Sequence, residues 1–338
     1  MALHPAAPPA APPGPLSGPP ASTRGRSADR GMDRGFRWLA ISAGVLMLLV
    51  LAAVALFLVI QALPALRRGG SISEVVNWIP QGESLWTVIG PLVFGTVLAA
   101  LASVAMAVPV SIGIALFISH YAPRRLANVL GYLVDLLAAI PSVVFGLWGV
   151  MVFAPVVQPV WGFLVRVLGW IPLFAGDAHG QASAPPRVLM TVSVVLAVMI
   201  LPIITAVSRE VFLQTPRLHE EAALALGATR WEVVRMAVLP FARSGIVSAA
   251  MLGLGRALGE TMAVLMILSP GLLYSWKLLV AGQQQTIAAN IAARFADADT
   301  IGVSTLIATG LALFIITLVV NVAARAVVAR RKDFSGAN

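Results

Sequence analysis

The sequence is poor in charge and contains no cysteine. Of its 338 residues, 59% are hydrophobic and only 11% are charged, whereas soluble globular domains carry about 25% charged residues. The absence of cysteine excludes disulfides, thiolate metal sites and a cysteine nucleophile. The formal net charge of +9 is spread too thinly to predict a nucleic-acid surface. The composition therefore indicates an integral membrane protein.

Motifs for nucleotide binding and for catalysis are also missing. The chain has no G-x-x-x-x-G-K-[ST] loop to hold the phosphates of ATP, and the glycines of "GLGRALGE" are wrongly spaced for a dinucleotide loop. His219-Glu220 lacks the second histidine of a zinc protease, and no G-x-S-x-G occurs. His120 is interpreted as a membrane-edge residue rather than a metal ligand. We predict no catalytic site, metal site or cofactor in this chain.

Long apolar runs are abundant instead. A membrane-spanning helix needs about 20 mostly apolar residues. Six spans are predicted, at approximately 38–60, 89–118, 127–154, 188–207, 245–266 and 301–324. The shorter stretch 156–175, with Arg166 between two tryptophans, is expected to be interfacial or re-entrant, because tryptophan favours the headgroup level. The fold class is therefore an all-α integral membrane protein.

The two ends of the chain are expected to lie outside this transmembrane domain of 37–332. Residues 1–36, rich in proline, predict a disordered tail that lacks a secretory signal, and residues 333–338 form a short C-terminal tail. Basic residues concentrate in the N-terminal tail and in the segments 124–125, 209–243 and 325–332. The positive-inside rule places these segments and both termini in the cytoplasm, which requires an even number of spans.

The longest cytoplasmic connection, 215–240, is predicted to be a helical hairpin. Thr215 is the expected N-cap of the first helix, with Pro216 at its first position. Leu218, Ala222 and Leu226 follow at four-residue spacing and form an apolar stripe.

The second half of the hairpin has its own start signal. Gly227 is expected to end the first helix. Thr229 and Glu232 form a T-x-x-E capping box for a second helix, which carries Trp231, Val234 and Val238 on one face and stops at Pro240. Such a hairpin could dock on another protein or pack only on its own helices, and these residues alone favour neither.

Two charges lie inside the fifth span. Arg256 and Glu260 are four residues apart and can meet on one helical face. Gly255 and Gly259 form a G-x-x-x-G that would let another backbone approach closely. One interpretation is a buried ion pair that fixes helix register. The other places Arg256 on a translocation path for an oxyanion, which suits its planar fork of donors, with Glu260 holding its orientation.

Asp135 is a further acidic residue within a predicted span. It is interpreted either as a helix-packing residue or as part of a charge network with Arg256.

The hairpin resembles the EAA loop of ABC-importer permeases. Glu221, Ala222 and Ala223, then Gly227, then Leu239 and Pro240 stand at the family's spacing, and Ala237 replaces the usual isoleucine. The resemblance implies the type I ABC importer permease (MetI-like) fold, with a cytoplasmic coupling helix that docks in a groove of an ATPase subunit. Glu221 would pair with a group on that ATPase, which would bind the ATP and Mg.

Two other motifs, "AAIPSVVFGLWG" at 138–149 and "RALGETMAV" at 256–264, resemble the PstC family, permease subunits of bacterial phosphate importers. The resemblance covers roughly 38–330. It implies half of a pathway for inorganic phosphate across the bacterial inner membrane, with Arg256 and Glu260 associated with phosphate passage. The implied partners are a PstA-like second permease, a PstB-like ATPase dimer and a PstS-like binding protein outside the membrane.

Other functions stay open on the residues alone. The EAA loop does not distinguish phosphate from molybdate, sulfate, an amino acid or a sugar. An ion-coupled carrier, with Asp135 and Glu260 carrying protons, is disfavoured by the hairpin and by the lack of an evident inverted repeat. A membrane-embedded enzyme would need clustered polar residues, and only isolated charges occur.

Overall fold

The computed structural model describes residues 26–68, 76, 78–79 and 83–329, so residues 1–25 of the expected N-terminal tail and the tail 333–338 lie outside the described residues. The described ranges contain helices and no strand. In chain order the helices are α1 (Arg26–Arg68), α2 (Leu85–Leu116), η2 (Phe117–Tyr121), α3 (Arg124–Ala138), α4 (Ser142–Trp148), η3 (Gly149–Phe153), α5 (Ala154–Leu168), η4 (Pro172–Phe174), α6 (Leu189–Leu213), α7 (Arg217–Ala225), α8 (Arg230–Val233), η5 (Val234–Val238), α9 (Leu239–Leu258), α10 (Met262–Ile267), α11 (Ile287–Arg294), η6 (Phe295–Asp297) and α12 (Thr300–Ala329).

The chain divides into two compact units, Met1–Val54 and Ala55–Asn338, and the boundary falls within α1. In the first unit the helix already begins at Arg26, so residues 26–36 are helical rather than part of an irregular tail. In the second unit, Ala62 and Ala65 near the end of α1 are buried in an apolar cluster.

Six helical segments of the described chain are long and apolar enough to cross a membrane, which confirms the expected number. They are Gly35–Arg68, Leu85–Tyr121, Ser142–Leu168, Leu189–Leu213, Arg230–Leu258 and Thr300–Ala326. The all-α membrane fold class is confirmed as well.

The third segment differs from the expected span 127–154. The helix breaks between Ala138 and Ser142, because the residue before Pro141 disfavours the helical conformation. The first part becomes the separate helix α3, which packs on α6. The apolar segment then continues from α4 through the π-helical turn η3 into α5. Residues 156–168, expected to be interfacial or re-entrant, are thus the last part of a segment long enough to span.

The fifth segment is also displaced from the expected 245–266. It begins at Arg230 in the hairpin and ends at Leu258, and α10 follows only after a break. Pro240 does not stop the hairpin's second helix. In the π-helical turn η5, the backbone N–H of Leu239 bonds to the carbonyl of Val234, and Pro240 then occupies the first turn of α9, where a missing N–H costs nothing.

The core of the second unit is built around α6, where 61% of the residues in the most apolar stretch are buried. This helix packs along α2 and α9 and also contacts α3 and α10. Gly253 marks the crossing of α9 and α6, since a Cβ there would lie 2.6 Å from Cδ1 of Ile204. The close crossing fixes the part of α9 that precedes Arg256.

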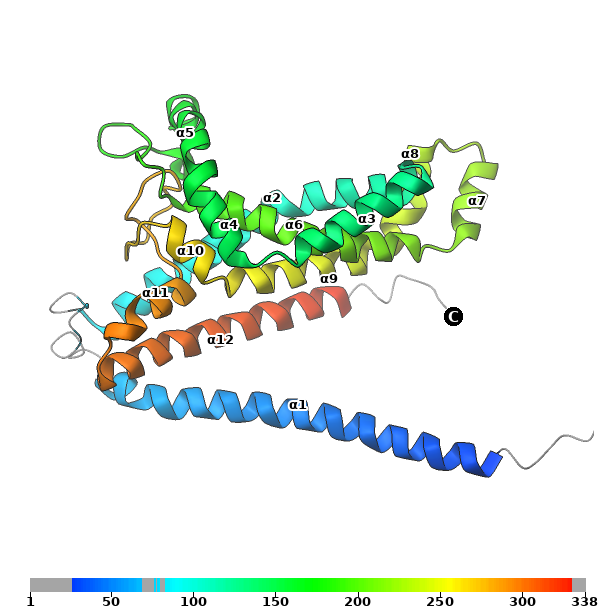
Figure 1. Ribbon diagram of the computed structural model, residues 1–338, viewed down its shortest axis with the longest axis horizontal. Coiled ribbons are helices and arrows are strands. Elements are labelled where there is room, and N and C mark those ends of the chain that lie inside the picture. The colour runs from blue at the N-terminus through cyan, green and yellow to red at the C-terminus, as the bar shows by residue number, and fades with distance from the viewer. Residues whose placement is uncertain (1–25, 69–75, 77, 80–82, 330–338) are drawn as a thin grey trace, which may run out of the picture. The chain divides into compact units, whose positions relative to one another are not determined.

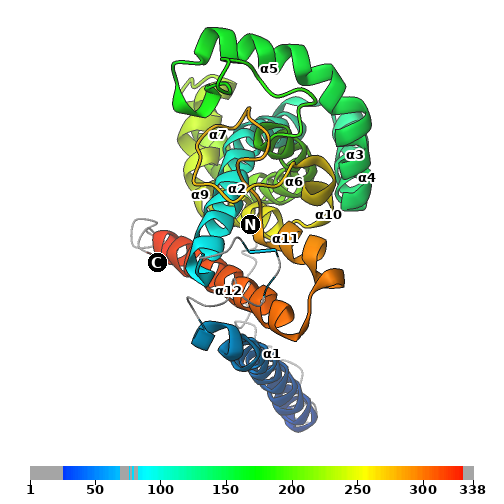
Figure 2. The same cartoon turned by 90° about the vertical axis from the view of Figure 1, so that its left-hand side faces the viewer.

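The second unit has two distinct ends. Figure 1 shows α7 and α8 beyond the end of the α2, α6 and α9 group, at what we call the hairpin end. The helices α5, α10 and α11 and their loops lie at the opposite end (Figure 2). Helix α12 runs beside α9 and packs against it.

Candidate functional site

Arg256 lies in the last turn of α9, three residues after the close crossing at Gly253. Its side chain is partly exposed, but Nε is buried and has no hydrogen-bond partner among the described residues. A buried guanidinium N–H without an acceptor is costly, because its desolvation is not compensated. The described chain therefore supplies no acceptor for this N–H.

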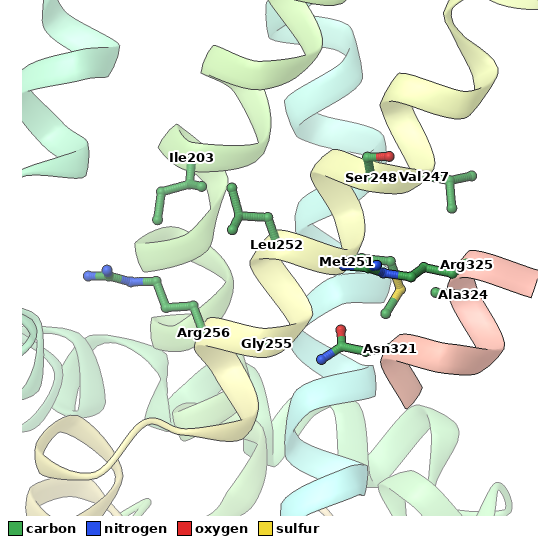
Figure 3. A pocket seen from close by; sticks show the side chains of 10 residues that line it. All are labelled: Ile203, Val247, Ser248, Met251, Leu252, Gly255, Arg256, Asn321, Ala324 and Arg325. Carbon is green, nitrogen blue, oxygen red and sulfur yellow. The ribbon is translucent and has the colours of Figure 1, made fainter. Parts of the chain in front are cut away.

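A cavity of about 870 Å³ opens beside Arg256 between α6, α9 and α12 (Figure 3). It is lined by Ile203 of α6, by Val247, Ser248, Met251, Leu252, Gly255 and Arg256 of α9, and by Asn321, Ala324 and Arg325 of α12. Within the described part of the chain, two of the lining side chains are arginines and none is a carboxylate. The cavity therefore favours an anion over a cation.

Glu260 does not pair with Arg256. It falls in the break between α9 and α10, where its Oε1 accepts a hydrogen bond from the backbone N–H of Ala263 at 3.1 Å. Among the described residues no ion pair or hydrogen bond joins Glu260 to Arg256. The expected meeting of the two charges required an unbroken helix. The buried carboxylate instead satisfies a free N–H in the first turn of α10, where a negative charge is favourable.

The two motifs that carry the PstC resemblance meet in space. Gly146 of α4 and Gly149 of η3, both in the 138–149 motif, lie close to α10. A Cβ at Gly146 would lie 3.0 Å from Cα of Ala263, and one at Gly149 would lie 2.7 Å from Cδ1 of Ile267. The glycines are therefore required for close helix packing, and α4 and α10 form one tightly packed pair.

Arg187 is a residue that the sequence analysis missed. It donates from Nε to the carbonyl of Ile267 and from Nη2 to that of Met266, both at 3.4 Å, at the C-terminal end of α10. Short α10 is thus held by a carboxylate at one end and a guanidinium at the other, each suited to the helix dipole. The sequence signal was weak, because Arg187 is nearly 80 residues from its acceptors.

Asp135 is not brought to the cavity. It is exposed on α3, and in the described part of the chain its side chain has no hydrogen bond or ion pair. The helix packs on α6 near Gly131, where a Cβ would lie 2.9 Å from Nη1 of Arg209. The structure therefore gives no support to a charge network between Asp135 and Arg256.

Gly227 ends α7 as expected. Its φ is +85°, in the left-handed region. The N–H of Gly227 bonds to the carbonyl of Leu224 at 2.9 Å, and that of Ala228 bonds to the carbonyl of Ala223 at 3.1 Å. This is the Schellman motif, which satisfies the last carbonyls of a helix. The EAA residues thus lie in the helix that this glycine terminates.

The helix starts of the hairpin are confirmed in one case and wrong in the other. The reciprocal capping box between Thr229 and Glu232 is present. Thr215, however, is not the N-cap of α7. The cap is Pro216, and the Thr215 hydroxyl is buried without a partner in the described ranges. Since proline has no N–H and a fixed φ, it begins the helix without a side-chain cap.

The two apolar faces of the hairpin have different surroundings. Val234 and Val238 are buried against Phe212, Leu116 and Ala115, which belong to the ends of α6 and α2. The stripe on α7 is instead open, with Leu218 78% and Leu226 90% exposed. Trp231 is also exposed, so it does not share the buried face with the two valines. The second helix packs on its own chain, and the apolar stripe of the first is exposed.

The two adjacent glutamates of α7, Glu220 and Glu221, also differ in their surroundings. Glu220 lies 3.7 Å from Nε2 of His120 in η2, and the other ring nitrogen lies 2.7 Å from the Ser119 hydroxyl. Glu221 is exposed. The described residues contain no group of three or more His, Cys, Asp or Glu side chains that could hold a metal. The contact between Glu220 and His120 therefore links α7 to η2, which continues directly from α2.

Comparison with known proteins identifies the family. Residues 107–333 match the family described as "Binding-protein-dependent transport system inner membrane component". The chain is 46% identical over 300 residues to "Phosphate transport system permease protein PstC 2" of Mycobacterium tuberculosis, covering 86% of this chain and 90% of that protein. It is 48% identical over 283 residues to PstC of Mycobacterium leprae, covering 81% and 86%.

One more distant relative and one solved structure also match the chain. The identity to PstC of Haemophilus influenzae is 37% over 305 residues, covering 86% of this chain and 91% of that protein. A chain in a solved structure of the MetNI methionine ABC transporter, described as inward facing, matches with a TM-score of 0.51 at 17% identity, over 72% of this chain and 96% of that one. This likeness shows the shared fold. The chain belongs to the binding-protein-dependent inner membrane permeases of ABC transporters and, within them, to the PstC family.

Proposed function

We propose that this chain is the permease subunit of an ATP-driven importer and forms half of the pathway for inorganic phosphate across the bacterial inner membrane. The observation that carries the proposal is the partly exposed side chain of Arg256, which lines a cavity with no carboxylate among its described lining residues. Relatives that are 37–48% identical are named phosphate transport permeases. The arginines that line the cavity and the names of the relatives both indicate an oxyanion as the transported ion.

An arginine at this position suits phosphate for a physical reason. A charge at the bilayer centre costs about 2.5–3.5 kcal/mol on insertion scales, so Arg256 must face a polar space rather than lipid. Its planar guanidinium presents paired N–H donors that match two oxygens of a tetrahedral oxyanion. An anion in the cavity would approach the partly exposed guanidinium that lines it.

A second permease subunit, PstA-like, would complete the pathway. A Cβ added at Gly255 would meet no heavy atom of the described residues within 4 Å, and one added at Gly259 would meet only the carbonyl oxygen of Gly255, at 3.8 Å. The G-x-x-x-G face expected to receive another backbone is thus open within the described chain, together with the exposed Leu252. That face supports a helix of the partner subunit, which would form one wall of the cavity because Gly255 and Leu252 line it.

A PstB-like ATPase dimer would dock on α7. The exposed stripe of Leu218 and Leu226 supplies an apolar contact, and the exposed Glu221 supplies a charge for a basic or polar group of the ATPase. ATP and Mg would bind to the ATPase and not to this chain. The hairpin end is then cytoplasmic, as are both termini, and a PstS-like binding protein would deliver phosphate at the opposite end.

The experiment is phosphate uptake by the assembled importer in proteoliposomes, with the binding protein supplied at the opposite side. Arg256→Ala should abolish uptake or reduce it greatly, and Arg256→Lys should retain less uptake than charge alone predicts, because the fork is lost. Complex formation is checked by co-purification. Normal uptake with alanine at 256, or uptake of sulfate or molybdate in preference to phosphate by the unaltered complex, contradicts the proposal.

A further inference from the structure

Helix α12 contributes a second basic group to the cavity beside Arg256. Asn321 and Arg325 lie four residues apart, so they share one face of α12, and both line the cavity. Both side chains are exposed within this chain. The side-chain amide of Asn321 and the guanidinium of Arg325 together offer donors suited to an oxyanion.

The two arginines occupy different parts of the cavity. Figure 3 shows Arg325 extending from α12 toward α9, in the direction of Met251, whereas Arg256 points away from α12 on the side of Ile203. Met251 precedes Arg256 by five residues, which is about 7.5 Å along the helix. Because α9 starts at the hairpin, Arg325 lies nearer the hairpin end than Arg256 does. The arginines therefore make two sites rather than one clamp.

A simpler role for Arg325 would be a basic anchor at the membrane surface. The sequence already supplies that anchor, because Arg330, Arg331 and Lys332 follow beyond the end of α12. An anchor also gives no reason for Asn321 to line the same cavity one turn earlier. The phosphate of a lipid headgroup and free phosphate share one chemistry, so the experiment below has to separate them.

We propose that Asn321 and Arg325 form a second oxyanion site, on the hairpin side of Arg256, which receives phosphate as it leaves Arg256. This proposal rests on the proposed function. Rapid passage requires binding that is favourable enough to admit an ion but divided among sites so that the ion can leave. The cavity of about 870 Å³ has room for an oxyanion with several waters. A single tight site at Arg256 would hold its ion, and a second site offers an exit.

The test uses the complete importer in proteoliposomes, with the concentration of phosphate-loaded binding protein varied up to saturation. Arg325→Gln should lower the maximal uptake rate roughly tenfold, and Asn321→Ala roughly threefold, since each removes hydrogen bonds to a charged ion. The KM for loaded binding protein should stay unchanged, because capture precedes this site. Arg325→Lys should fall between Gln and the unaltered chain. Arg124→Gln, on the exposed start of α3, is the matched control for loss of a surface charge.

Each measurement is made in pure phosphatidylcholine and in vesicles with added phosphatidylglycerol. The proposal predicts the same loss for Arg325→Gln in both lipids and no loss for Arg124→Gln. It is overturned if Arg325→Gln transports normally, if its loss appears only with the anionic lipid, or if Arg124→Gln is equally impaired. If the Arg325 variants are normal while Arg256→Ala is inactive, only this inference fails. If the unaltered complex does not import phosphate, the proposed function fails with it.

Discussion

Replacing Gly227 separates the role of the hairpin bend from that of packing. The residue has a φ of +85°, and no described atom lies within 4 Å of the position that a Cβ would take. A larger side chain therefore meets backbone strain and no steric clash. The left-handed conformation costs an L-residue about 1–2 kcal/mol. A loss of that size changes the population of the open helix end by a factor of roughly 5–30.

The assay is amide hydrogen exchange at positions 227 and 228, whose N–H groups close the end of α7. Gly227→Ala and Gly227→Val should exchange roughly 5–30 times faster than the unaltered protein, and Gly227→Asn should change little, because asparagine tolerates this conformation. Substrate-stimulated ATP hydrolysis of the complete importer should fall in the same order. The same variants thus report the stability of the bend, through hydrogen exchange, and its effect on the ATPase, through ATP hydrolysis.

Gly113→Ala is the matched control. Gly113 also has open space around its Cβ position, but it lies inside α2 with no positive φ. Alanine there should be neutral or stabilise the helix by about 0.5–1 kcal/mol. Unchanged exchange and unchanged ATPase stimulation in Gly227→Val would refute the reasoning that a left-handed bend presents α7 to the ATPase.

Glu260→Gln keeps an oxygen that can accept from the N–H of Ala263, so the variant should unfold at nearly the unaltered temperature. Glu260→Ala should lower the free energy of unfolding by about 0.5–2 kcal/mol. Equal losses in the two variants, measured by thermal unfolding, would instead indicate a charge partner for Glu260. Gly146→Leu should destabilise the α4–α10 pair by about 1–3 kcal/mol, measured by thermal unfolding against Gly162→Ala, which has open space. Glu220→Gln should lower the free energy of unfolding by at most about 1 kcal/mol, because its pairing with His120 is partly exposed. Glu221→Gln should reduce the stimulation of ATP hydrolysis. If Glu220→Gln reduces that stimulation and Glu221→Gln does not, Glu221 does not face the ATPase.

The elements that sequence reasoning predicted best are governed by local chemistry. The Thr229 capping box and the bend at Gly227 depend on residues within a few positions of each other, and both are present. The count of six apolar segments in the described chain depends on composition alone, and it is correct. Where the signal was short in range, the structure agreed with it.

Errors arose where two local signals competed. Hydropathy joined 127–154 into one span, but Pro141 breaks that stretch and shifts the span toward α5. A four-residue spacing suggested that Arg256 and Glu260 pair, but Gly259 ends α9 and the carboxylate turns to the N–H of Ala263. In both cases the backbone break decided the outcome, because it changed which side chains share a face.

Other parts of the site needed tertiary structure. Asn321 was an unremarked polar residue of the last span, and Arg325 counted only as a basic flank. A polar residue followed four positions later by an arginine near a helix end is a signal that could have been used. Only the packing of α12 beside α9 places both in the cavity with Arg256.

The helical segment Arg230–Leu258 connects the hairpin to the cavity. Its 29 residues form a rod of about 43 Å, which contains the capping-box helix at one end and Arg256 at the other. Near the hairpin, Val234 and Val238 pack on the ends of α2 and α6, so a displacement there moves several helices together. Helix α12 has no comparable link to the hairpin among the described contacts. A displacement of α7 should therefore shift Arg256 relative to Arg325. In the proposed importer, ATP binding to the ATPase would displace α7, and the resulting change in distance between the two guanidinium groups would move the ion from the Arg256 site to the Arg325 site.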